Sequence, residues 1–364
     1  MTEEPGETAK IPFFQQGELE RITQMVTQEF QIEETPRFQN VPTYYLSQPQ
    51  ETKQPFLRLL KNLEKIDMIA FLRKTDGKTV LRIVPKPHVK PSNVLVNWVL
   101  LLATIATTFV SGYYSSLGII NPILGGATFT TAILAILGTH EMGHKLTANK
   151  KGVEATNPYF IPGPQPLGTL GAVIMQKSLP PNRDALFDIG ADGPVAGFII
   201  ATIVSLFGLM LLIPTAKPTN PSMAPAPIPV PLLWTLLAQL LQGINLMPHA
   251  GPNQDLLLHP ITFAGWAGLV VTMLNLLPAG MLDGGHVVRS IAGEKLRLGL
   301  AGLSIVFLII EGFWPMAILV VFLSLFKDPG PLDDVSSLST SRKLMAIALV
   351  AIFILCIFPQ IPSL

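Results

Sequence analysis

Two histidines and a glutamate stand close together inside an apolar stretch of this sequence. The stretch TTAILAILGTHEMGHKLTANK, Thr130–Lys150, contains His140, Glu141 and His144. On a helix, side chains four residues apart project from one face, so the two imidazoles can bind one zinc ion. Glu141 can then act as a general base toward a water that the metal activates. Ionisable groups are costly in an apolar segment, so we interpret these three as functional.

A catalytic zinc site normally has three protein ligands and one open position. The single cysteine, Cys356, lies in a distant apolar run, so we expect the third ligand to be His, Asp or Glu. The stretch NLLPAGMLDGGHVVRS offers Asp283, where Pro278 disrupts an apolar run and several glycines free the backbone. We predict that Asp283 is the third ligand, with His286 as its rival.

The composition indicates a membrane protein. Hydrophobic residues make up 49% of the 364 residues and charged residues only 13%, whereas soluble globular proteins carry about 25% charged residues. The net charge of +1 gives no indication of a nucleic-acid partner. The acidic N-terminus resembles neither a secretory signal nor an organellar transit peptide, which favours a bacterial chain or a trimmed mature form.

Two regions differ in composition, and we predict a domain boundary between residues 92 and 93. Residues 1–92 hold 13 of the 25 Lys and Arg residues and no long apolar run. We expect them to form a small soluble α+β domain with a linker. Its predicted elements are helices over Gly17–Phe30 and Gln54–Lys65, and a hairpin over Met68–Val84 that turns at Asp76-Gly77.

Residues 93–364 are expected to form the membrane domain, with about six or seven transmembrane helices. The predicted spans are Val94–Val110, Ala127–Leu146, Ile189–Ile213, Ile261–Leu277, Leu298–Ile310, Pro315–Phe326 and Leu344–Phe358. The fifth and sixth are short for a bilayer core of about 30 Å, so they could form one helical hairpin. We expect the helix over Pro231–Ile244 to lie at the interface, because glutamines interrupt it.

The distribution of positive charge predicts the orientation of these spans. If residues 1–92 are cytoplasmic, only Lys217 among all Lys and Arg residues falls in an outer loop. The span that carries His140 and the span that ends shortly before Asp283 then both run from outside to inside. His140 lies about 20 Å into its span at 1.5 Å per residue, and Asp283 follows the end of the other. Both groups therefore approach the inner third of the bilayer, where they could share a metal.

The two motifs together resemble the site-2 protease family of intramembrane zinc metalloproteases. That family carries HExxH on one core helix and NxxPxxxxDG on another, which here is Asn275, Pro278, Asp283 and Gly284. The resemblance covers roughly residues 95–330. The soluble N-terminal segment and the run NPYFIPGPQPLGTLGAVIMQ look most like the cyanobacterial and plastid branch, the ethylene-dependent gravitropism-deficient and yellow-green group.

This resemblance implies a fold and a role for each residue. The fold would be an all-α polytopic membrane protein with a site-2 protease core, a short membrane-associated β hairpin or loop, and the α+β N-terminal domain. His140, His144 and Asp283 would bind one Zn²⁺, and Glu141 would be the general base. Asn275 would position the substrate peptide or stabilise the oxyanion. In GADGPVAG, Gly193, Pro194 and Gly197 would allow close helix packing near the site, although ordinary packing of small residues explains them equally well.

The expected activity is hydrolysis of peptide bonds within or near transmembrane helices, with Pro166–Met175 as an extended edge that holds the unwound substrate. The resemblance implies single-pass membrane proteins as substrates and a bacterial, cyanobacterial plasma or thylakoid membrane as the location. The N-terminal domain could bind a regulatory partner. Two alternatives stay open. A catalytically silent scaffold would have the same fold, whereas a transporter would use the buried ionisable groups as an ion path.

Overall fold

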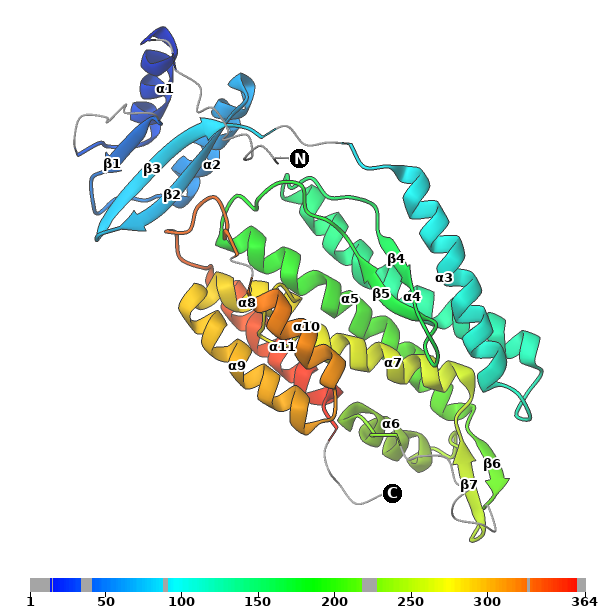
Figure 1. Ribbon diagram of the computed structural model, residues 1–364. Helices are drawn as coiled ribbons and strands as arrows, with labels where there is room; N and C mark the ends of the chain where they lie inside the picture. Colours follow the sequence, from blue (N-terminus) through cyan, green and yellow to red (C-terminus); the bar gives the residue numbers. More distant parts are fainter. Residues whose placement is uncertain are drawn as a thin grey trace, which may run out of the picture. The chain divides into compact units, whose positions relative to one another are not determined.

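A computed structural model describes residues 14, 16–33, 41–87, 91–217, 228–325 and 328–358, which fall into two compact units (Figure 1). Unit 1 consists of Met1–Lys90 with two short segments, Leu179–Arg183 and Gly330–Ser337. Unit 2 consists of Pro91–Ser178, Asp184–Pro329 and Leu338–Leu364. Part of the predicted linker and Phe326, the end of one predicted span, lie outside the described residues.

Unit 1 contains a three-stranded antiparallel sheet in the order β1-β3-β2. Its elements are α1 (Gln16–Glu29), β1 (Thr43–Leu46), α2 (Lys53–Leu63), the short 3₁₀ helix η1 (Glu64–Ile66), β2 (Met68–Thr75) and β3 (Lys78–Pro85). The β2–β3 hairpin turns at Asp76 and Gly77, which both have positive φ, as a tight hairpin turn requires. Alternate residues of the strands, including Leu72, Leu81 and Ile83, are fully buried in the core of the unit.

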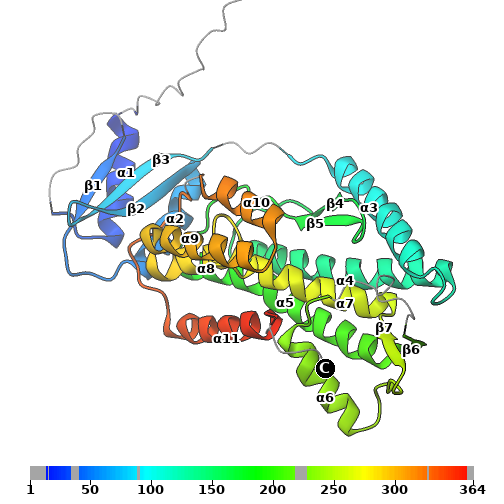
Figure 2. The same cartoon turned by 60° about the horizontal axis from the view of Figure 1, so that its bottom comes forward.

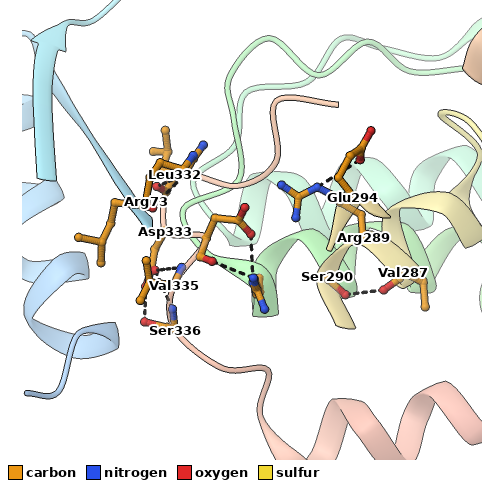
Figure 3. A network of polar contacts seen from close by, with 12 residues as sticks. Arg73, Val287, Arg289, Ser290, Glu294, Leu332, Asp333, Val335 and Ser336 are labelled. Atoms are coloured by element: carbon orange, nitrogen blue, oxygen red, sulfur yellow. Dashed lines mark hydrogen bonds and ion pairs between the residues drawn. The ribbon is translucent and has the colours of Figure 1, made fainter. Parts of the chain in front are cut away.

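Two segments from far along the chain extend this sheet beyond β2. Leu72 donates its N–H to the carbonyl of Leu332 at 2.9 Å and accepts from Asp334 at 3.1 Å. Leu332 in turn donates to the carbonyl of Pro180 at 2.8 Å. Arg73 also donates to Leu332, as Figure 3 shows. Unit 1 is therefore built from three separate parts of the sequence, an arrangement that no local pattern indicated.

The helices of unit 2 occur where the sequence analysis predicted spans. They are α3 (Val94–Ser115), α4 (Pro122–Lys150), α5 (Arg183–Met210), α7 (Pro260–Asn275), α9 (Glu294–Ile310), α10 (Trp314–Ser324) and α11 (Thr340–Cys356). Among the described residues, α3, α4 and α5 are long and apolar enough to cross a membrane. The described part of the chain is thus mostly helical and contains three candidate membrane helices.

Helix α5 begins six residues before the predicted start of its span, because its polar first turns have partners. Asp184 accepts hydrogen bonds from the N–H and hydroxyl of Ser339, at 2.9 and 2.5 Å. Asp188 accepts two from the guanidinium of Arg342, at 2.8 and 2.6 Å. These bonds satisfy carboxylates that hydrophobicity alone places outside the helix, and they join the start of α5 to the start of α11.

A short hairpin, β4 (Tyr159–Pro162) and β5 (Thr169–Val173), lies beside α3 in both ribbon views (Figures 1 and 2). Asn97 on α3 donates from its amide nitrogen to the carbonyls of Asn157 and Pro158, at 3.1 and 2.9 Å. Thr107 donates to the carbonyl of Gly168 at 2.6 Å. The predicted extended edge, Pro166–Met175, thus contains the strand β5, and polar side chains of α3 hold the residues just before β4 and just before β5.

The remaining elements of unit 2 follow α5 and α7. The strands β6 (Ile213–Ala216) and β7 (Gln254–Leu257) pair antiparallel, and α6 (Leu232–Gly243), the helix expected at the interface, lies between them in the sequence. Asn275 ends α7, two residues earlier than predicted, and an irregular loop leads to α8 (Asp283–Ala292). Asp283 thus stands at the first position of a new helix.

Candidate metal centre

The HExxH motif lies on α4, in the buried part of unit 2. His140, Glu141 and His144 are each less than a tenth exposed. Helical spacing brings the imidazoles of His140 and His144 together, with their Nε2 atoms 3.1 Å apart. The two histidines project from one face of an uninterrupted helix, as the sequence predicted.

Asp283 completes a compact group of three donor residues. Its Oδ2 lies 3.2 Å from Nε2 of His140 and 3.2 Å from Nε2 of His144. Ligand bonds of about 2.0–2.1 Å in a tetrahedral zinc site separate neighbouring donor atoms by roughly 3.3 Å. Two nitrogens and one oxygen at this spacing fit three corners of such a site. The residues present therefore fit a zinc ion, and the fourth corner is left for a water or a substrate.

The ring orientation of His144 is set by a carbonyl of α5. Nδ1 of His144 lies 2.6 Å from the carbonyl oxygen of Ile189. Because a carbonyl can only accept, Nδ1 must carry the proton, and the lone pair is left on Nε2, which faces the centre. A carbonyl that accepts a hydrogen bond from the ring nitrogen away from the metal fixes the tautomer of a metal-binding imidazole and raises its basicity. The carbonyl of Ile189 is thus a functional group that the sequence analysis missed.

Two glycines of α5 leave the space that the histidine rings occupy. A Cβ added at Gly193 would lie 2.1 Å from Nε2 of His144. One added at Gly197 would lie 2.9 Å from Nδ1 of His140. Such contacts are far below van der Waals distance, so these positions accept no side chain while the rings keep their places. The glycines of GADGPVAG therefore form the wall behind the donor group.

Glu141 and Asn275 both reach the edge of the centre. Oε1 of Glu141 lies 4.0 Å from Nε2 of His140, and its carboxylate accepts a hydrogen bond from the N–H of Ile174, directly after β5. Nδ2 of Asn275 lies 3.4 Å from Nε2 of His140. The carboxylate and the amide thus lie beside the donors without being part of the group. The link from Ile174 involves a backbone N–H, for which the sequence holds no signal.

His286, the rival third ligand, points elsewhere. It lies one turn along α8 from Asp283, and its Nδ1 is 3.3 Å from Oδ2 of Asp328. Among the described residues, the donor atoms that meet within 4.8 Å of one another belong to His140, His144 and Asp283.

Comparison with known proteins identifies the family. Residues 128–309, half of the chain, match the model of peptidase family M50, and the match includes both motifs. The chain belongs to peptidase family M50. It is 28% identical over 313 residues to the probable zinc metalloprotease EGY2, chloroplastic, of Oryza sativa subsp. indica, covering 79% of this chain and 54% of that protein. It is 34% identical over 235 residues to EGY1, chloroplastic, of Oryza sativa subsp. japonica, covering 62% of this chain and 39% of that protein.

A third relative, EGY2, chloroplastic, of Arabidopsis thaliana, is 29% identical over 297 residues, which cover 77% of this chain and 52% of the relative. The chain thus spans about half the length of the curated relatives it matches, or less. No solved structure gives a significant match. Family M50 is the site-2 protease family, so the membership establishes this chain as a member of a metalloprotease family and implies zinc at its centre.

Proposed function

We propose that this family M50 member is an intramembrane zinc metalloprotease that hydrolyses peptide bonds within or near transmembrane helices. One observation carries the proposal. The donor atoms of His140, His144 and Asp283 meet in a tetrahedral spacing among apolar helices, and the carboxylate of Glu141 lies beside them. A scaffold without activity would have no need of that carboxylate, which is costly to bury.

His140, His144 and Asp283 would hold one zinc ion, which when bound supplies a Lewis acid that acidifies water and polarises a carbonyl. Glu141 would accept the proton of the attacking water at its carboxylate and deliver it to the leaving amine. The N–H of Ile174 restrains that carboxylate on the β5 side. Asn275 would donate from its amide to the substrate, where it positions the peptide or stabilises the developing negative charge.

The β5 strand would hold the substrate. A transmembrane helix satisfies its own backbone groups, so a substrate must unwind locally and needs new partners for them. Within the described residues, β5 pairs only with β4 in its sheet, and its other edge remains for strand addition. Leu170, Val173 and Met175 are exposed along this segment, where they can contact apolar substrate side chains. Because Ile174 contacts Glu141, a peptide on this edge would lie next to the general base.

The wider setting is part of the same proposal. The shorter apolar helices would complete a bundle of about six or seven spans in a lipid bilayer. Unit 1 would be a soluble domain on the cytoplasmic side of a bacterial plasma or thylakoid membrane, available to a regulatory partner. The substrates would be single-pass membrane proteins. The distribution of Lys and Arg between the loops supports this orientation, because only Lys217 then falls in an outer loop.

A paired assay on detergent-purified full-length chain tests the proposed activity. Wild type and Glu141→Gln are compared for zinc content and for cleavage of a model transmembrane helix. We expect one zinc per chain in both and cleavage in wild type alone, because the amide keeps the ligands but cannot accept the proton. Zinc in both with cleavage in neither would favour the silent scaffold. Folded wild type without zinc would remove the basis of the proposal.

A further inference from the structure

One fully buried cation among the described residues of unit 2 lies outside the donor group and has no part in the proposed reaction. Arg297, in the first turn of α9, has no exposed surface. Its Nε and one terminal nitrogen donate to the two carboxylate oxygens of Glu294, at 2.8 and 2.6 Å. The other terminal nitrogen donates to the carbonyl of Gly280 at 2.5 Å. The guanidinium thus joins a carboxylate on its own helix to a carbonyl three residues before Asp283.

The loop that receives this bond packs tightly against the start of α8. Gly280 has φ of +54°, and its carbonyl oxygen would lie 2.5 Å from a Cβ added at Gly285. The N–H of Leu282 donates to the carbonyl of Ala279 at 3.2 Å, which closes a turn just before Asp283. A shift of the Gly280 carbonyl would therefore move Asp283, because the close packing on Gly285 and the turn at Leu282 leave little room for independent movement.

The corner between α8 and α9 is short. A single residue, Gly293, separates the helices, and it has φ of +79°. Gly293 donates its N–H to the carbonyl of Arg289 at 3.1 Å. Arg289 also reaches back to the same carboxylate of Glu294, with Nε 3.6 Å from Oε2, as Figure 3 shows. Arg297 therefore connects the two ends of α8. It binds Glu294, which contacts Arg289 near the end of α8, and it binds Gly280 in the loop that precedes the first residue of α8.

Burying the guanidinium of Arg297 is a costly way to stabilise a fold. Taking a charge out of water costs several kcal/mol, and well-packed apolar residues of similar size often serve stability equally well. What the planar guanidinium adds is a fork with fixed directions, which can bind a carboxylate and a carbonyl at once. Directional bonds of this kind suit a group that must hold a loop in one position.

We propose that Arg297, oriented by Glu294, is a positioning residue that fixes the Gly280–Leu282 turn and so places Oδ2 of Asp283 against the two histidines. The inference rests on the proposed zinc-dependent function. It adds a support to the oxygen ligand, which lies at the first position of α8 directly after an irregular loop, whereas both nitrogen ligands lie inside the continuous helix α4.

The test measures metal binding by the full-length chain in detergent. Arg297→Lys keeps the charge but cannot form the fork, and Arg297→Met keeps similar bulk without charge. We expect both to weaken zinc affinity by about 10–100-fold, the usual effect of losing a group that orients a ligand. The visible absorption of the Co²⁺-substituted protein should change as well, because it reports the geometry of the ligands. Arg289→Lys, which alters the other ion pair of Glu294, serves as the matched control and should keep the wild-type spectrum.

Unchanged zinc affinity and cobalt spectrum in folded Arg297→Lys and Arg297→Met would overturn the proposal and leave Arg297 a purely structural residue. A lower melting temperature of the metal-free protein with normal affinity would do the same. If neither variant folds, Glu294→Gln applies the test, because it loosens the fork while its own side chain is partly exposed. Wild type that binds neither metal would instead contradict the proposed function itself.

Discussion

Replacement of Gly193 by alanine provides a sensitive test of the donor geometry. The new Cβ would lie 2.1 Å from Nε2 of His144, and 2.4 Å from both Cδ2 and Cε1. Non-bonded heavy atoms need about 3.5 Å or more, so the ring must move by more than about 1 Å. Zinc–ligand distances vary by only about 0.2 Å between sites. We therefore expect Gly193→Ala to weaken zinc affinity by at least about 100-fold.

The same substitution should affect the stability of the metal-free fold much less. Alanine is favoured over glycine inside a helix by about 1 kcal/mol, which offsets part of the 1–3 kcal/mol typical of overpacking. Zinc affinity is measured by competition with a coloured chelator, and the melting temperature is measured without metal. Gly138→Ala on α4 is the control, because its Cβ would meet only Phe160 Cζ, at an ordinary 3.7 Å. Wild-type zinc affinity and cleavage in Gly193→Ala would refute the wall that we describe.

Three further predictions concern other parts of the chain. Gly168→Ala brings a Cβ to 2.4 Å from the carbonyl oxygen of Thr107, so β5 must shift. Cleavage should fall about 10-fold or more with zinc retained, because a loss of roughly 1.4 kcal/mol in transition-state stabilisation lowers the rate tenfold. The control variant Gly152→Ala, which also has positive φ but open space around the new Cβ, should cleave normally. Asp333→Ala removes the acceptor of the backbone N–H groups of Val335 and Ser336 and should lower the stability of unit 1 by about 2–5 kcal/mol. This loss should appear as faster amide hydrogen exchange in β2, and unchanged exchange would contradict the prediction. Burial raises the pKa of Tyr44, so the neutral side chain stabilises unit 1 fully below pH 10, and this contribution is lost as the pH rises through the raised pKa. The difference in tyrosinate absorbance between wild type and Tyr44→Phe should titrate with a midpoint above pH 10. A midpoint at or below pH 10 would contradict this prediction.

The chemistry of the centre could be predicted from local sequence, because a helix repeats every 3.6 residues. That period alone places His140 and His144 on one face and Glu141 beside them. Pro278 and the glycines after it indicated a break in the backbone near Asp283, and α8 does begin there. The sequence favoured Asp283 over His286, and the fold places the carboxylate of Asp283 beside the two histidines and His286 beside Asp328.

Backbone N–H and carbonyl groups that orient the site could not be identified from the sequence, because every residue type except proline carries both. The carbonyl of Ile189 and the N–H of Ile174 orient His144 and Glu141, yet any residue at those positions offers the same atoms. Helix α5 likewise begins before its apolar run, because residues at the start of α11 form hydrogen bonds with its carboxylates. The hydrophobicity pattern of α5 does not predict these partners.

Residue types and short-range periodicity determined which elements form and which side chains can do chemistry, because both depend on neighbours within a few residues. The composition and two short motifs were sufficient to indicate a membrane protein with a metal site. Tertiary structure alone decided which distant groups meet: the third donor, the glycine wall, the fork of Arg297, and the segments that join the sheet beside Leu72. These contacts arise from packing between elements far apart in the chain, which no local pattern encodes.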